Sequence, residues 1–274
     1  PPQLGEGSRP NMTQDAGNRP ELTLAIFVDF ENLALGAEDL KGGRFDIELV
    51  LKRLLEKGRI VAKRAYCDWT RYRQFMQEFH LHGFEMIDIP QTKVSGKNSA
   101  DIRMVVDALD LCYSKSHIDA FALLTGDSDF SPLVSKLKEN DKRVIGCGIR
   151  NSTSSLLAGN CDEFIFYDDL VKVSQRPRRR ARKAKGGEQT EQQTEQQLAL
   201  ERVAETVESL AQEYDPLWES LVKQTVRRVY PGFNETACGY RSFSELLEDA
   251  ARHGLLELEF DKERGNYMVR ATGN

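Results

Sequence analysis

Two aspartates separated by one residue follow an apolar run in the stretch FALLTGDSDFSP, residues 121–132. The run is typical of a strand buried on both faces of a parallel sheet, and the Thr-Gly pair marks where the chain leaves the sheet. Ligands of open α/β sheets bind just outside the carboxyl ends of the strands. Asp127 and Asp129 are therefore candidate catalytic residues. The alternative is an ordinary polar turn in which Asp129 or Ser131 caps a helix.

Two further acids occupy comparable places. Asp29 ends the first apolar run, residues 22–29, and Asn32 follows it closely. Asp101 lies in the first turn of a predicted helix over residues 100–113, where stabilisation of the helix N-terminus is an equally simple explanation for a carboxylate.

A sheet that brings these acids to one edge would make an all-carboxylate site. With few His or Cys residues available, such a site favours Mg²⁺ or Mn²⁺, which bind hard oxygen ligands. Four carboxylates held close together repel one another unless a cation neutralises them. The same cation can clamp a phosphodiester and lower the pKa of an attacking water.

Alternating strands and helices predict the scaffold that positions the acids. The fold class is α/β: a doubly wound parallel sheet, PIN-like and Rossmann-like, with helices on both faces. No GxGxxG or GxxxxGK[ST] motif is present, which argues against a dinucleotide site and a P-loop. The predicted strands are residues 22–29, 59–68, 84–90, 120–124, 142–149 and 163–167, and the predicted helices are residues 45–57, 72–82, 100–113, 133–137 and one that starts at 152–157.

Two predicted helices carry apolar stripes. Tyr72, Phe75, Met76 and Phe79 recur at helical intervals, which favours core packing over a platform for stacked bases. In the helix over residues 100–113, we expect an apolar stripe of Ile102, Val105, Val106 and Leu109.

Composition shifts divide the chain into four segments. Residues 1–21 are rich in Pro, Gly, Asn and Gln and are expected to be disordered. The α/β domain spans 22–173, and a basic, Gln/Glu-rich linker spans 174–197. Residues 198–272 are expected to form a small winged-helix domain, with helices over 198–210, 217–229 and 242–253 and a hairpin of 255–260 with 266–270.

A strongly basic run, RPRRRARKAK, stands out against the net charge of −5. It holds 7 of the 38 basic residues, and without it 31 basic residues face 43 acidic ones. Such a run attracts polyanions, although a solvated linker or a localisation tag is an alternative. The candidate RNA contacts in it are Arg178, Arg179, Arg180, Arg182 and Lys183.

The five cysteines are scattered, without a CxxC pair, and are expected to be reduced core thiols. No apolar run approaches the ~20 residues that span a bilayer, so we expect no membrane association and a cytoplasmic location.

Three motifs in order resemble the NYN domains of the PIN-like nuclease superfamily: FVDFEN at 27–32, GKNSADIRMVVDAL at 96–109 and TGDSDFSPLV at 125–134. The resemblance implies a ribonuclease acting on single-stranded RNA. Its metal-binding and catalytic acids would be Asp29, Asp101, Asp127 and Asp129, with Asn32, Asp107 and Ser131 around them. Many relatives read Lys-Gly-Val-Asp where this chain has one residue more between Lys97 and Asp101.

The stretch GYRSFSELLEDA, residues 239–250, resembles OST-HTH domains, also called LOTUS domains. That resemblance implies RNA binding, with Tyr240 and Arg241 as contacts, or docking of a protein partner. Two other functions stay open at this point. One is a catalytically silent RNA-binding adaptor. The other is a haloacid-dehalogenase-like phosphatase, which needs an Asp where this chain has Glu31.

Overall fold

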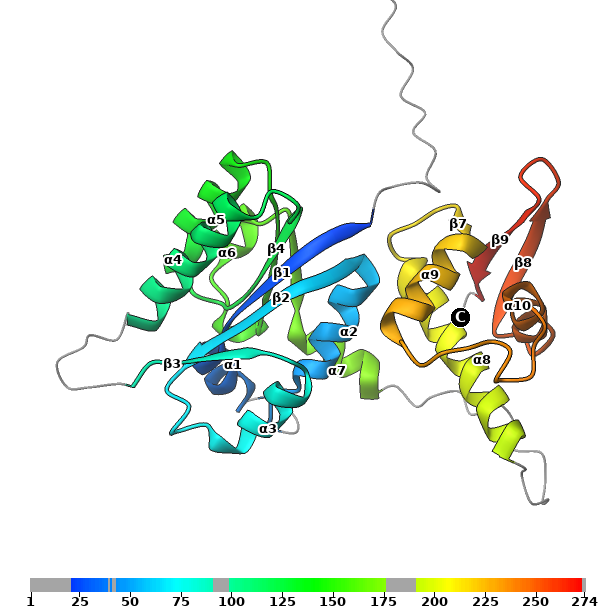
Figure 1. Ribbon diagram of the computed structural model, residues 1–274, viewed down its shortest axis with the longest axis horizontal. Helices are drawn as coiled ribbons and strands as arrows, with labels where there is room; N and C mark the ends of the chain where they lie inside the picture. Colours follow the sequence, from blue (N-terminus) through cyan, green and yellow to red (C-terminus); the bar gives the residue numbers. More distant parts are fainter. Residues whose placement is uncertain (1–20, 39, 41–42, 91–98, 176–190, 273–274) are drawn as a thin grey trace, which may run out of the picture. The chain divides into compact units, whose positions relative to one another are not determined.

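The computed structural model describes residues 21–38, 40, 43–90, 99–175 and 191–272. The chain divides into two compact units, whose described residues run from 21 to 175 and from 191 to 272 (Figure 1). The basic run 176–185, Lys97 and the N-terminal segment predicted to be disordered lie outside the described residues. Within the described ranges, no helix is both long and apolar enough to cross a membrane.

A six-stranded parallel sheet forms the centre of the first unit, in the order β3-β2-β1-β4-β5-β6. The chain builds outward from β1 through β2 to β3, then returns to place β4 on the other side of β1. The strand order therefore reverses between β1 and β4, and the α/β prediction is confirmed. The strands are β1 Leu22–Asp29, β2 Gly58–Cys67, β3 Glu85–Asp88, β4 Ala120–Leu124, β5 Arg143–Gly148 and β6 Glu163–Phe166.

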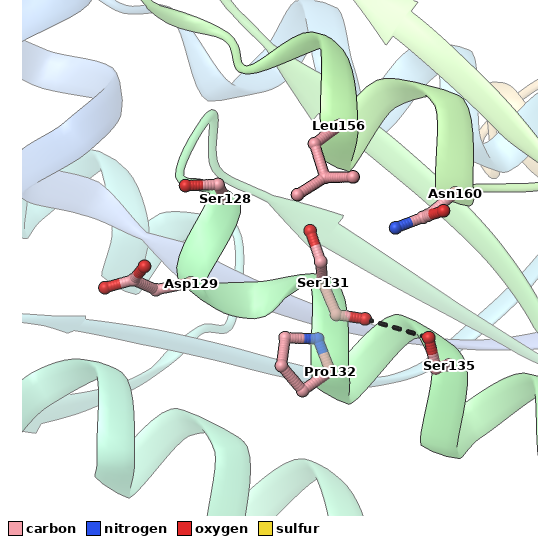
Figure 2. A pocket seen from close by; sticks show the side chains of 7 residues that line it. All are labelled: Ser128, Asp129, Ser131, Pro132, Ser135, Leu156 and Asn160. Carbon is pink, nitrogen blue, oxygen red and sulfur yellow. Dashed lines mark hydrogen bonds between the residues drawn. The ribbon is translucent and has the colours of Figure 1, made fainter.

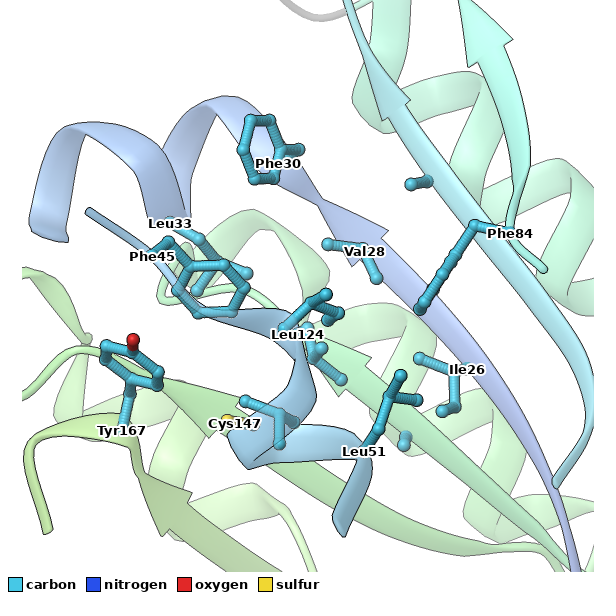
Figure 3. Packing of buried hydrophobic residues seen from close by; sticks show 14 of the residues in the cluster. Ile26, Val28, Phe30, Leu33, Phe45, Leu51, Phe84, Leu124, Cys147 and Tyr167 are labelled. Carbon is cyan, nitrogen blue, oxygen red and sulfur yellow. The ribbon is translucent and has the colours of Figure 1, made fainter. Parts of the chain in front are cut away.

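Helices cover both faces of this sheet, as Figure 1 shows. On one face, Ile26 and Val28 of β1 pack into a core with aromatic side chains such as Phe30 and Phe45 (Figure 3). Leu24 belongs to the same core. This core is covered by α1 Phe30–Ala37, α2 Ile47–Lys57, α3 Arg73–Leu81 and α7 Tyr167–Gln175. The other face is covered by α4 Ser99–Ser114, α5 Ser131–Glu139 and α6 Ser155–Asn160.

Strand β1 is apolar from Leu24 to Val28 because it is buried on both faces. Successive side chains point to opposite faces, and both faces are buried under helices. The short helices η1 Ser128–Phe130 and η2 Arg150–Ser152 follow the ends of β4 and β5.

Three details of the first unit differ from the sequence prediction. Helices α1 and α7 were not predicted, and α7 continues beyond residue 173. The predicted stripe on α4 is also wrong in part, because Met104, Ala108 and Cys112 are its buried residues. Val105 and Leu109 of the predicted stripe are partly buried against the same core. Ile102 and Val106 are 63% and 55% exposed.

The second unit contains three helices and a three-stranded antiparallel sheet in the order β7-β9-β8. Its elements are α8 Glu191–Leu210, β7 Leu217–Trp218, α9 Glu219–Val229, α10 Phe243–Arg252, β8 Leu256–Asp261 and β9 Asn266–Ala271. The predicted hairpin is present as β8 and β9, whereas residues 217 and 218 form a strand instead of a helical turn. Ser242 caps helix α10, since its Oγ accepts a hydrogen bond from the Glu245 N–H at 3.1 Å.

Candidate active site at the strand switch point

Asp29 lies at the point where the strand order reverses. It is the last residue of β1, and the preceding Val28 is in register with Leu124, the last residue of β4. Crevices at such switch points are where doubly wound sheets bind their ligands. The Asp29 side chain is largely enclosed, since the residue is only 8% exposed. Both of its oxygens accept hydrogen bonds, from the Thr125 hydroxyl at 2.9 Å and from the Asn32 N–H at 3.4 Å.

Thr125 connects Asp29 to Asp127 through one hydroxyl group. Its Oγ1 donates to Asp29 and accepts a hydrogen bond from the Asp127 N–H at 3.2 Å. The residue is fully buried. Sequence reasoning did not assign Thr125 a role. The available signal was its position two residues after Leu123, because residues two apart in a strand lie on the same face.

Asn32 holds the two strand ends together from the side of α1. Its Oδ1 accepts a hydrogen bond from the Gly126 N–H at 2.9 Å, while its own N–H donates to Asp29. Gly126 cannot carry a side chain here, because a Cβ would lie 2.6 Å from the backbone oxygen of Ser152. The Gly126 oxygen also accepts a hydrogen bond from the Ser154 N–H at 2.8 Å. The turn that presents Asp127 is therefore anchored on both sides.

Electrostatic coupling places three of the predicted acids in one site. The pKa of Asp29 is raised from its ordinary 3.8 to about 7, first by burial and then by the negative charge of Asp101. Asp127 raises this pKa further, and the hydrogen bonds from Thr125 and Asn32 only partly offset these effects. Asp101 reaches the site from the first turn of α4. Asp101 and Asp127 thus lie near enough to Asp29 for their charges to act on it.

Asp129 occupies the exposed end of the same turn. Its N–H donates a hydrogen bond to the Asp127 Oδ1 at 2.9 Å, so Asp127 is the residue that caps η1. The alternative in which Asp129 or Ser131 serves as the helix cap is wrong, because α5 follows Phe130 without a side-chain cap. In Figure 2 the Asp129 carboxylate points away from Leu156.

Asp107 belongs to the surroundings of the site. It accepts a hydrogen bond from the Tyr66 hydroxyl at 2.9 Å and pairs with the Arg103 Nε at 3.0 Å. Tyr66 is the residue of β2 that lies in register with Asp29. Burial and the negative charge of Asp107 raise the pKa of Tyr66 above its usual range, so this hydroxyl stays a hydrogen-bond donor. Tyr66 is a second neighbour of the acids that the sequence analysis did not identify.

The donor set suits a divalent cation in its chemistry. Within the described ranges, no group of three or more Asp, Glu, His or Cys side chains lies close enough to enclose a metal ion. Mg²⁺ does not require such a cage, because it is usually held by one or two carboxylates together with waters and substrate phosphates. Asp29, Asp101 and Asp127 offer oxygen ligands whose mutual repulsion a cation would relieve. These residues therefore fit Mg²⁺ or Mn²⁺.

The predicted RNA contacts in the second unit have different surroundings. Tyr240 is only 6% exposed and its hydroxyl donates to the Asp249 Oδ2 at 2.7 Å, so it packs inside the unit and cannot stack on a base. The prediction of Tyr240 as an RNA contact is therefore corrected. Arg241 is exposed. The five basic candidates between residues 178 and 183 lie outside the described residues.

Comparisons with known proteins identify the family of the first unit. A family model described as the NYN domain matches residues 23–168. The uncharacterized protein MJ0482 from Methanocaldococcus jannaschii is 27% identical over 165 residues, which are 60% of this chain and 63% of that protein. The chain thus spans less than two thirds of the length of this curated relative.

Among solved structures, a protein of unknown function from Vibrio parahaemolyticus, VPA0982, is 26% identical, with a TM-score of 0.48. The match covers 55% of this chain and 95% of that one. The family match ends at residue 168, so a relation of the second unit to OST-HTH domains stays a prediction. Over residues 23–168, this chain belongs to the NYN domain family and hence to the PIN-like nuclease superfamily.

Proposed function

We propose that this chain is a metal-dependent endoribonuclease that hydrolyses phosphodiester bonds of single-stranded RNA. The observation that carries the proposal is the coupling of Asp29, Asp101 and Asp127 at the strand switch point of a nuclease-family domain. A buried carboxyl whose pKa is raised by two neighbouring acids is a poor structural element and a good site for a cation.

We assign the acidic side chains to metal binding and Thr125 to positioning them. Asp29 and Asp127 hold the ion, with Asp101 completing the carboxylate set from α4 and Asp129 available at the exposed margin. Thr125 fixes the carboxylate of Asp29 and the backbone of Asp127 in one geometry. When bound, Mg²⁺ or Mn²⁺ supplies neutralisation of the scissile phosphate and a lower pKa for the attacking water.

An acidic site repels RNA until a cation is bound, so RNA affinity must come from positive charge elsewhere. We assign it to the basic run 176–185 and to the second unit, which we propose to be a winged-helix module of the OST-HTH type. Arg241 is the exposed basic residue at the start of its helix α10. Docking of a protein partner is the alternative role of this unit.

Two other functions account less well for the site. A silent RNA-binding adaptor would have no need of three coupled carboxylates. A haloacid-dehalogenase-like phosphatase would need an Asp two residues after Asp29. Glu31 stands there instead, and its Oε1 is paired with the Arg71 guanidinium at 3.0 Å.

The proposal is tested by incubating the full chain with labelled single-stranded RNA and with a duplex of the same sequence, with Mn²⁺ or with EDTA. We expect internal cleavage of the single strand that requires Mn²⁺ and much slower cleavage of the duplex. RNA that is bound but left intact under all conditions would support the adaptor instead.

A further inference from the structure

A pocket of about 450 Å³ opens beside the turn that carries the catalytic acids (Figure 2). It lies between η1, α5 and α6, and its volume is in the range of sites that bind small organic groups. Its lining residues are Ser128, Asp129, Ser131, Pro132, Ser135, Leu156 and Asn160. It therefore adjoins the acidic site through Asp129.

The lining is amphipathic and almost uncharged. Three serine hydroxyls and the Asn160 amide provide donors and acceptors, while Pro132 and Leu156 provide apolar surface. Among the lining residues that the structure describes, none is Lys or Arg. The single charged member, Asp129, directs its carboxylate away from Leu156 and Asn160 in Figure 2. The pocket therefore offers a phosphate no cationic partner. It offers a flat neutral group apolar surface for its faces and hydrogen-bonding groups for its edge.

The hydroxyl of Ser131 gives a second, independent indication of a ligand. Ser131 is only 8% exposed, and its Oγ makes no hydrogen bond with any described residue. Buried hydroxyls are nearly always paired, and leaving one unpaired is costly. Ser131 is the first residue of α5, and Phe130 before it offers no side-chain cap. A ligand group in the pocket would provide this hydroxyl with a partner.

We propose that the pocket receives an unpaired base of the RNA strand, next to the nucleotide whose phosphodiester bond is cut. The faces of the base lie against Leu156 and Pro132, and its edge meets Asn160 and the serine hydroxyls. Asn side chains commonly bind base edges through paired hydrogen bonds. This inference rests on the proposed ribonuclease function and adds a physical reason for single-strand preference, because a paired base cannot leave its stack without cost.

The test uses a short labelled single-stranded RNA in which each base is removed in turn while its ribose is kept. Binding to the full chain is measured by fluorescence anisotropy with Mn²⁺ and a strand whose linkages resist hydrolysis, so that the acidic site is neutralised and the strand stays intact. We expect loss of one particular base to weaken binding about tenfold, within the range found for single base contacts. The discrimination, which is the difference in affinity between the intact strand and the strand lacking that base, should vanish in Ser135→Trp. This substitution fills the pocket from an exposed helical position.

Gln77→Trp is the matched control, since it adds the same ring at an exposed position of α3 that does not line the pocket. It should keep the discrimination of the parent chain. Ser131→Ala should reduce it without filling the pocket. Equal discrimination in Ser135→Trp and the parent, or no position-dependent effect in the parent, would overturn the inference. Base discrimination without Mn²⁺-dependent cleavage would refute the ribonuclease function and leave the base pocket standing.

Discussion

Replacement of Asp29 by Asn should stabilise the metal-free protein above neutral pH. The folded state raises the pKa of this carboxyl from 3.8 to about 7, mainly because it is buried beside Asp101. Each pKa unit is worth 1.36 kcal/mol, so the ionised carboxylate costs the folded state roughly 4 kcal/mol at most. The amide of Asn keeps an acceptor for Thr125 or Asn32 but leaves some hydrogen bonds imperfect. A net gain of about 2–3 kcal/mol is therefore expected at pH 8.

The pH dependence of this gain follows from the direction of the pKa change. Between pH 3.8 and 7 the folded state binds a proton at Asp29 that the unfolded state has released, so the parent chain loses stability as pH rises through this range. Asp29→Asn has no such proton, and the stability difference between the two chains should shrink towards pH 4.

Thermal melts of the first unit in EDTA, taken from pH 5 to 8.5, measure both effects. A gain of 2–3 kcal/mol corresponds to a rise of roughly 5–10 °C for a unit of this size. Asp110→Asn, the same change at an exposed acid of α4, is the control and should alter little. A parent-like pH profile in Asp29→Asn, or a lower melting temperature at pH 8, would refute the electrostatic account of this site.

Three further perturbations test the neighbouring parts of the account. Thr125→Val removes the hydroxyl that bridges Asp29 and Asp127. In pH-dependent melts it should raise the pKa of Asp29 further and lower stability by about 1–3 kcal/mol. An unchanged pH profile would show that this hydroxyl does not stabilise the Asp29 carboxylate. Mn²⁺ at a hundredfold excess over its Kd should stabilise the parent by about 2.7 kcal/mol, and EDTA should reverse this gain. An equal gain in Asp29→Ala would show that Asp29 does not bind the ion. Truncation after Gln175, which keeps α7 whole, should weaken RNA binding. The slope of log affinity against log salt concentration should become shallower by ~0.7 for each phosphate contact that is lost. An unchanged affinity and slope would reassign the second unit to protein docking.

The strand ends and their acids could be predicted from the sequence because two simple rules apply to them. Fully apolar runs mark strands of a buried parallel sheet, and parallel strands present their carboxyl ends at one edge. Asp29 ends such a run and Asp127 lies three residues after the end of another, so their proximity required only the correct strand order.

Other features depended on tertiary contacts that local patterns do not contain. Helix α4 carries two overlapping apolar stripes. Its rotation about its own axis, which is set by packing on the sheet, buries Met104 and Ala108 and leaves Ile102 exposed. Helix α1 has buried Phe, Leu and Ala side chains and shows little polar periodicity, so it was missed. The resemblance that made Tyr240 an RNA contact did not contain its burial or its hydrogen bond to Asp249, nine residues further along the chain.

Single-turnover cleavage of single-stranded RNA by Asp127→Asn tests the central claim most directly. The substitution removes one negative charge but keeps the oxygen that accepts the Asp129 N–H, so η1 should remain capped. With saturating Mn²⁺, the account predicts a rate lower than that of the parent by ~10²-fold or more, with a melting temperature in EDTA no lower than that of the parent. A rate within a fewfold of the parent would contradict the claim that these carboxylates form the active site.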